Sequence, residues 1–182
     1  MRTPLTILAA AGLAGTSAGL AAGSAAQAPA PDTPALTYVF SIRAELLPPI
    51  EQGVVDGLRK RFIPISGGHV DGPRLRGVVL AGGGDWQTID KSGRTEVYAR
   101  YTLKADDGTI IDVVNPGMRI ASAEVTDRLA RGEPVDPAAY YFRTTPRFEV
   151  AAGPHDWLRR SVFVARGVRK PDHVEIHIFA VE

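Results

Sequence analysis

Hydrophobic residues from Leu36 onward recur mostly at every second position, which is the spacing of β-strands with one buried face. This alternation predicts strands at residues 37–44, 74–81, 86–89, 96–103, 109–115, 140–150, 160–168 and 173–181. Turn residues separate them at Ser66-Gly67-Gly68, Asp71-Gly72-Pro73, Ser92-Gly93, Asp107-Gly108, Asn115-Pro116-Gly117 and Lys170-Pro171-Asp172. Short strands and turns at this spacing favour an all-β sandwich or barrel.

The strand at 96–103 shows how the pattern assigns side chains to two faces. Tyr98 and Arg100 share one face, and the other face carries Val97, Ala99, Tyr101 and Leu103. The less apolar face is either a solvated surface or the polar lining of a pocket. Which of the two it is decides most of what the sequence says about function.

Only residues 123–131 have a helix-compatible composition, and Gly132 and Pro134 would end that helix. The segment lies in an excursion between two predicted strands, from Met118 to Ala139. We expect it to form one short helix that could cover one end of a barrel.

The N-terminus follows a different pattern. A positive charge at Arg2 precedes an apolar run at 5–22 and a small-residue segment at 23–26, which is the plan of a secretory signal peptide cut after Ala26. A transmembrane anchor is the alternative, but the run is rich in Ala and Gly, and no positively charged flank follows it. We therefore expect a signal peptide at 1–26, a Pro/Ala tether at 27–35 and a β domain at 36–182. The mature protein would be periplasmic or secreted, without a stable membrane anchor.

Composition narrows the classes of partner. The chain has 182 residues, enough for one domain with a proper core, and 21 basic residues against 20 acidic ones. This balance argues against a nucleic-acid partner, for which a clustered basic surface is expected. The sequence contains no Cys, so disulfides, thiolate metal sites and lipoprotein attachment are excluded.

Two arginines are candidates for binding an acidic substrate. Arg100 alternates with aliphatic neighbours, and Arg143 follows three aromatic residues. A guanidinium matches a carboxylate with two parallel hydrogen bonds and stays charged when partly desolvated. The alternative is that each arginine only pairs with a structural carboxylate such as Asp85, Asp107 or Glu149.

Four residues are candidates for proton transfer: Asp85, Glu149, His69 and Tyr98. A general acid or base must titrate near the working pH, which His does unaided and a carboxylate does only when burial raises its pKa. Asp85 follows three glycines, so a ligand could approach it closely; the alternative is a carboxylate that caps its own turn. Glu149 is as well explained by a salt bridge, and His69 is expected on a mobile glycine-rich loop.

Aromatic residues concentrate in the central and C-terminal strands, and most are expected in the core. Trp86, Tyr141 and Trp157 are the best candidates for an apolar wall against a flat ligand.

Neither a metal nor a cofactor is expected. His173, Glu175 and His177 share one strand face, but the two histidines would lie about 13 Å apart, too far for one ion without other ligands. Gly82-Gly83-Gly84 is not a phosphate loop, because a β pattern follows it where such loops need a helix.

Several motifs resemble a bacterial and fungal family known by number, DUF 3237 or UPF 0311, over nearly all of the chain from Leu36. They are Gly83-Gly84-Asp85-Trp86, Ala99-Arg100-Tyr101, Asp106-Asp107-Gly108, Tyr141-Phe142-Arg143-Thr144, Pro146, Phe148-Glu149, Trp157-Leu158 and Val162-Phe163-Val164. The resemblance implies a single antiparallel β-barrel of lipocalin-like shape. It also implies small-molecule chemistry, since some members are linked to the catabolism of aromatic acids, including decarboxylation. The chain departs from the pattern in its signal peptide and in Arg159-Arg160.

Together these observations predict an exported β-barrel that binds a small organic acid in its interior, with an aromatic acid favoured. The favoured activity is a cofactor-independent lyase such as a decarboxylase, in which an arginine holds the acid while a carboxylate, Tyr or His moves a proton. A non-catalytic periplasmic binding barrel and a structural protein are the alternatives. A homo-oligomer is possible with any of them.

Overall fold

The computed structural model describes residues 32–182, and residues 34–182 form one compact unit. The predicted signal peptide at 1–26 and the tether up to residue 31 lie outside the described residues.

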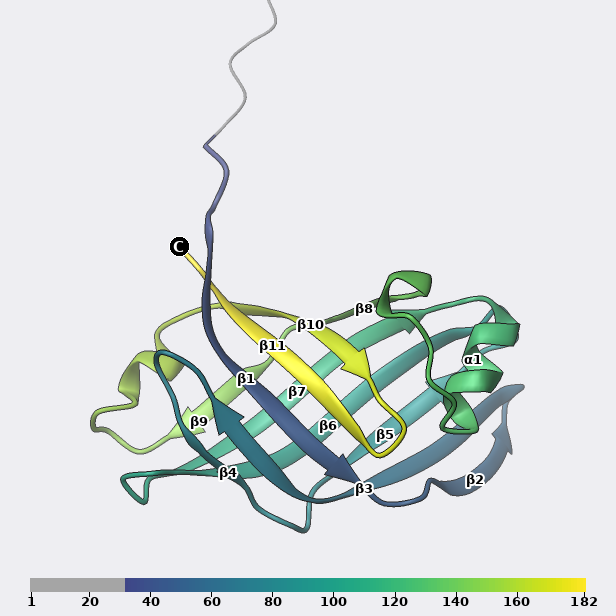
Figure 1. The fold of residues 1–182 in the computed structure, drawn as a ribbon, viewed down its shortest axis with the longest axis horizontal. Helices are drawn as coiled ribbons and strands as arrows, with labels where there is room; N and C mark the ends of the chain where they lie inside the picture. Colours follow the sequence, from purple (N-terminus) through teal and green to yellow (C-terminus); the bar gives the residue numbers. More distant parts are fainter. Residues whose placement is uncertain (1–31) are drawn as a thin grey trace, which may run out of the picture. The chain divides into compact units, whose positions relative to one another are not determined.

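Antiparallel strands dominate the chain, as the alternation of apolar residues predicts (Figure 1). The strands are β1 (Leu36–Leu46), β2 (Ile50–Val55), β3 (Leu58–Asp71), β4 (Gly77–Val79), β5 (Gly84–Ile89), β6 (Arg94–Ala105), β7 (Ile110–Ile120), β8 (Tyr141–Thr144), β9 (Arg147–Val150), β10 (Phe163–Arg169) and β11 (His173–Val181).

Eight of these strands close into an antiparallel barrel. Its order is β1, β3, β5, β6, β7, β8, β10 and β11, and β11 returns to β1 through pairs that run from Leu36–Val181 to Glu45–His173. β4 continues the position of β5 between β3 and β6, and β9 continues the position of β8 along β7. The prediction of a single antiparallel β-barrel is confirmed.

Two predicted turns are wrong, because long strands run through them. β7 continues past Asn115-Pro116-Gly117, which was expected to end it. Pro116 is tolerated because β7 changes its neighbour there: Ile111–Val114 pair with β9, and Gly117–Ile120 pair with β8. A residue without a backbone N–H therefore stands where no donor is needed on that side.

β3 was missed altogether, together with the exposed strand β2 that pairs with it. Its glycines are the reason, because Ser66-Gly67-Gly68 has the composition of a turn. In the structure the β1 backbone passes so close to Gly68 that a Cβ would lie 1.9 Å from the carbonyl oxygen of Arg43. The glycine therefore serves a close strand contact rather than a turn.

The predicted helix is confirmed as α1 (Ala123–Ala130), between β7 and β8. The Ser122 side chain caps its N-terminus by accepting a hydrogen bond from the amide of Val125 at 3.2 Å. Leu129 of α1 packs in one cluster with Val97 and Phe142, so this segment covers one end of the barrel. Within residues 32–182 no helix is long and apolar enough to cross a membrane.

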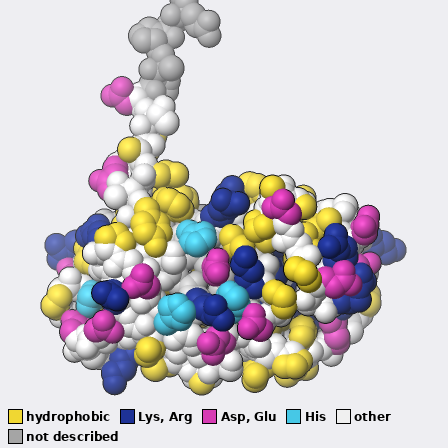
Figure 2. Space-filling model, viewed as in Figure 1, with side chains coloured by type: hydrophobic (Ala, Val, Ile, Leu, Met, Phe, Trp, Pro, Cys, Tyr) yellow, Lys and Arg dark blue, Asp and Glu magenta, His cyan; other side chains and the backbone are white. Residues whose placement is uncertain are grey.

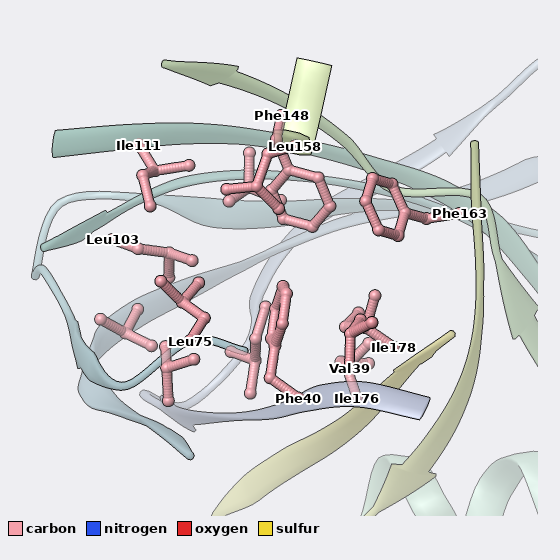
Figure 3. Packing of buried hydrophobic residues seen from close by; sticks show 14 of the residues in the cluster. Val39, Phe40, Leu75, Leu103, Ile111, Phe148, Leu158, Phe163, Ile176 and Ile178 are labelled. Carbon is pink, nitrogen blue, oxygen red and sulfur yellow. The ribbon is translucent and has the colours of Figure 1, made fainter. Parts of the chain in front are cut away.

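The half of the barrel away from α1 is filled by a packed apolar cluster (Figure 3). The rings of Phe40 and Phe148 meet edge-on with centroids 5.8 Å apart, and those of Phe148 and Phe163 meet at 5.1 Å. A 3₁₀ helix at Asp156–Arg159 places Leu158, 2% exposed, against this cluster. This half is a solid core.

Candidate functional site

The other half of the interior, the polar half, holds buried polar side chains among apolar ones and encloses a cavity with a free volume of about 40 Å³. That space has room for a few water molecules. Most of the cavity wall is apolar and includes Ala44, Ile63, Ile65, Ala99, Phe142 and Ile176. Its polar lining is formed by Asp85, Gln87, Tyr101, Asn115, Arg119, Thr144 and Arg169.

Strand register brings these polar side chains together. Ile63, Asp85, Ala99 and Asn115 form one row of paired residues across β3, β5, β6 and β7. The next row toward α1 contains Arg61, Gln87, Val97, Gly117 and Thr144. Because residues in register on neighbouring antiparallel strands face the same side, each row presents its side chains to the interior together.

A chain of hydrogen bonds links Arg61 to Asp85 through Gln87. The Arg61 Nε donates to Gln87 Oε1 at 2.8 Å, and Gln87 Nε2 donates to Asp85 Oδ2 at 2.5 Å. The second carboxylate oxygen, Oδ1, accepts the backbone N–H of Tyr98 at 3.1 Å. Asp85 is therefore held from the neighbouring strand β6 and does not cap its own turn.

Arg119 lies deeper still, with 1% of its surface exposed. Its Nη2 donates to Thr95 Oγ1 over a long 3.4 Å, and its Nε has no hydrogen-bond partner. Burial and, second to it, the positive charge of Arg61 lower the pKa of Arg119 to about 10, against the opposing charge of Asp85. The guanidinium therefore stays charged at neutral pH, but at an energetic cost.

A third arginine lies at the α1 end of the cavity. Arg169 Nη1 donates to the carbonyl oxygens of Lys170 and His173, the latter at 2.9 Å, and its backbone N–H donates to the Tyr140 hydroxyl at 2.9 Å. Burial, followed by the charge of Arg61, lowers the pKa of Arg169. Its contacts tie the cavity to the segment that covers this end.

Positive charge exceeds negative charge in this interior. The cationic side chains are Arg61, Arg119 and Arg169, whereas Asp85 is the carboxylate that lines the cavity. No ion pair within 4.0 Å joins Asp85 to an arginine among the described residues. Burial raises the pKa of Asp85 despite the opposing hydrogen bonds from Gln87 and Tyr98, so the carboxyl group holds its proton to a higher pH than usual.

Of the predicted site residues, the structure places only Asp85 in the cavity. The prediction that Arg100 and Arg143 bind an acid inside the barrel is wrong, because both side chains are exposed on its outer face. Arg143 lies over the Tyr141 ring at 5.0 Å and donates to the Phe142 carbonyl oxygen at 2.9 Å. Since alternate residues face opposite sides of a strand, neither side chain can reach the interior.

The apolar wall predicted from Trp86, Tyr141 and Trp157 is also not formed. Trp86 and Tyr141 lie on the outer surface with 46% and 48% exposure. Trp157 is half-buried, but it packs against Phe40 and Phe163 in the apolar half and lies under Arg74 at 3.7 Å. These three rings therefore do not face one ligand.

The remaining proton-transfer candidates lie apart from the cavity. Tyr98 is 50% exposed on the outer face of β6, and Glu149 is exposed on β9. His69 is exposed on β3 and lies in a strand rather than in a mobile loop. The side chains of these three residues therefore point away from the cavity that Asp85 lines.

Sequence reasoning missed most of the polar lining, Gln87, Tyr101, Asn115, Arg119, Thr144 and Arg169, and it missed Arg61, which hydrogen-bonds to Gln87. The available signal was a polar residue at a core position of the alternation. Arg119 has the same parity as Ile111 and Val113 in β7, and Arg61 has the same parity as Ile63 in β3. The early end assigned to β7 and the omission of β3 hid both arginines.

The predicted histidine row lies on the outer face of β11. Glu175 stands between the two rings, 3.4 Å from His173 Nε2 and 3.9 Å from His177 Nε2. Within residues 32–182 no three His, Asp or Glu side chains are placed to hold a metal ion. Figure 2 shows the histidines among interspersed acidic and basic side chains, so this face carries no patch of one sign.

Known proteins share both the sequence and the fold. Residues 34–181 match a family described as a protein of unknown function, DUF3237. A UPF0311 protein of Rhodopseudomonas palustris is 40% identical over 144 residues, which is 79% of this chain and 94% of that protein. A UPF0311 protein of Bradyrhizobium diazoefficiens is also 40% identical, with the same two coverages.

Solved structures agree. A conserved protein of unknown function from Rhodopseudomonas palustris superposes with a TM-score of 0.80 at 38% identity, covering 83% of this chain and 99% of that one. A beta-barrel like protein from Acinetobacter baumannii gives 0.73 at 34% identity, with 84% and 99% covered. A protein from Penicillium herquei described as an enzyme gives 0.64 at 19% identity, with 86% and 100% covered, and shares the fold. The chain belongs to the DUF3237 (UPF0311) family of β-barrel proteins.

Proposed function

We propose that this barrel binds a small organic acid inside its polar half. The observation that carries the proposal is the excess of buried positive charge around the cavity, with Arg61 and Arg119 at 2% and 1% exposure. The family resemblance favours an aromatic acid, whereas the small free volume of the cavity favours a short aliphatic one. The N-terminal pattern supports binding in the periplasm or outside the cell.

Electrostatics supports an anion as the missing partner. Removing a charged group from water costs several kcal/mol unless a counter-charge and hydrogen bonds replace the water. Asp85 offsets one of the three guanidinium charges at most, and less when it is protonated. A bound carboxylate would supply the missing negative charge and two acceptor oxygens that match the geometry of a guanidinium.

A second candidate function is decarboxylation of the bound acid, and the position of Asp85 favours it. Burial raises the pKa of Asp85, so its carboxyl group holds a proton to a higher pH than usual and can donate it. In that reaction the bond from carbon to the carboxylate breaks, carbon dioxide leaves, and the electron pair stays on carbon. The proton of Asp85 then forms the new C–H bond, and solvent returns a proton to Asp85.

Binding is tested by thermal shift and calorimetry with aliphatic and aromatic carboxylic acids. Wild type and the control variant Arg143→Met, which alters an exposed guanidinium, should bind the same acid with the same affinity. Arg119→Met should lose that binding. If no acid binds, or if Arg119→Met binds as wild type does, the interior anion site is wrong.

Turnover is then tested on the acid that binds best. Mass spectrometry should detect release of carbon dioxide by wild type and its loss in Asp85→Asn, while binding persists. Binding without any product in wild type would support a non-catalytic binding barrel instead.

A further inference from the structure

Unpartnered polar atoms are concentrated around the cavity. Among the described residues, the buried side-chain atoms without a hydrogen-bond partner are Tyr101 OH, Asn115 Oδ1, Arg119 Nε, Thr144 Oγ1 and His155 Nδ1. All of them except the histidine atom belong to residues that line the cavity. Buried polar groups in folded proteins are nearly always satisfied by protein, water or ligand, so such a cluster indicates that water or a ligand occupies the cavity.

The unpartnered atoms require two kinds of group from that partner. Arg119 Nε can only donate a hydrogen bond, so the ligand must present an acceptor. Asn115 Oδ1 can only accept one, so the ligand must also present a donor. The Tyr101 and Thr144 hydroxyls can serve either group; burial raises the pKa of Tyr101 well above its usual range, so its hydroxyl stays protonated.

The position of Asn115 reinforces the need for a donor. Asp85 lies in the same row as Asn115, with only the methyl side chain of Ala99 between them on β6. Asn115 lies beside Tyr101, and its amide N–H opposes the rise in the pKa of that phenol, but no hydrogen bond reaches Asn115 Oδ1. An acceptor-rich wall formed by Asp85 and Asn115 therefore faces the cavity beside the cationic Arg119.

The charge balance decides which donor fits. An ammonium group would donate to Asn115, but it would add another cation to an interior that already holds Arg61, Arg119 and Arg169. A hydroxyl group donates without adding charge. Water could satisfy Asn115 in the same way, but water supplies no negative charge for the arginines.

We infer that the ligand is a small hydroxy acid, whose carboxylate pairs with Arg119 and whose hydroxyl donates to Asn115 Oδ1. This inference rests on the proposed binding of an organic acid in the same cavity. It excludes amino acids and favours hydroxylated acids over the same acids without the hydroxyl.

Matched acids that differ at one atom test the inference by calorimetry. Mandelate, phenylacetate and phenylglycine form an aromatic set, and lactate, propionate and alanine form an aliphatic one. In the set that fits the cavity, the hydroxy acid should bind about tenfold or more tightly than the deoxy acid, because the deoxy acid leaves Asn115 Oδ1 unpaired. The amino acid should bind more weakly than the hydroxy acid.

Two variants locate the discrimination. Asn115→Leu should remove the preference for the hydroxyl while the deoxy acid still binds. Asn115→Ala removes the same oxygen without adding bulk and should likewise remove the preference, whereas the exposed Thr145→Val should bind as wild type does. Circular dichroism checks that each variant is folded, and Asn115→Ala provides the test if Asn115→Leu does not fold.

The outcomes separate the inference from the proposed function. If deoxy acids bind as tightly as hydroxy acids in wild type, the hydroxy-acid inference is overturned and acid binding stands. If amino acids bind most tightly, the inference is likewise overturned. If no acid of either set or of the wider panel binds, both proposals fall.

Discussion

The two halves of the barrel interior share the long strands β6 and β7 but differ in what their side chains do. In the half around Phe40 and Phe148, apolar side chains fill the space and leave few polar groups. In the half around Arg61 and Arg119, charged side chains surround a cavity, and several of their polar neighbours have no partner. The first half is packed as a core, whereas the second holds the buried charges on which the proposed binding site rests.

The change from one half to the other occurs within single strands. In β7, Ile111 and Val113 face the apolar half, and Asn115 and Arg119 continue the same inward face into the polar half. Strand alternation therefore fixes which residues point inward, and residue type along that face separates core from site. This comparison predicts that truncating a side chain in the apolar half lowers the free energy of unfolding. Replacing a charged side chain in the polar half by an apolar one should raise it.

The largest effect is expected in the apolar half. Phe148→Ala removes a ring that is 5% exposed and packs edge-on against Phe40 and Phe163, so it should lower the free energy of unfolding by about 3–5 kcal/mol. Urea denaturation measures this loss, with Trp86→Ala on the outer face as a control that should change stability far less. Equal losses in the two variants would contradict the assignment of the core to this half.

A smaller effect of opposite sign is expected in the polar half. The lowered pKa of Arg119 corresponds to roughly 3 kcal/mol of destabilisation of its charged form, at ~1.4 kcal/mol per tenfold change in acidity. Arg119→Met keeps a long side chain without the charge, so without ligand it should raise the free energy of unfolding by about 1–3 kcal/mol. Urea denaturation at neutral pH measures the gain, and Arg143→Met should show none. A destabilised Arg119→Met would mean that the arginine is structural.

The sequence predicts the fold better than it predicts the site. Alternation identified most of the barrel strands because each has one buried apolar face. It failed where glycine and proline serve strand contacts, at Gly68 beside the β1 backbone and at Pro116 where β7 changes neighbours. Local composition does not distinguish these uses from turns, since the deciding contact comes from a distant strand.

The site was missed for a related reason. Arg100 and Arg143 have aliphatic or aromatic neighbours in the sequence, but adjacent residues in a strand face opposite sides, so such neighbours do not show which way an arginine points. Asp85 was identified because it follows flexible glycines, yet its role depends on Gln87 and on the amide of Tyr98 in β6. Cross-strand register, which the sequence does not display, gathers the interior arginines.

The smallest effect concerns the pH dependence of stability. Burial raises the pKa of Asp85 in the folded state, so folding favours its protonated form. The stability that this preference contributes is fully present below the unfolded pKa and is lost as pH rises through the higher folded pKa. Asp85→Asn cannot ionise, so its stability relative to wild type should increase across that interval and then level off. Urea denaturation between pH 3 and pH 8 measures the difference, and Asp106→Asn, which alters an exposed carboxylate, should show no such rise. If the stability of Asp85→Asn relative to wild type falls with pH, Arg61 and Arg119 stabilise the ionised carboxylate more than burial destabilises it. The polar half would then be a balanced network of charges rather than a site that lacks an anion.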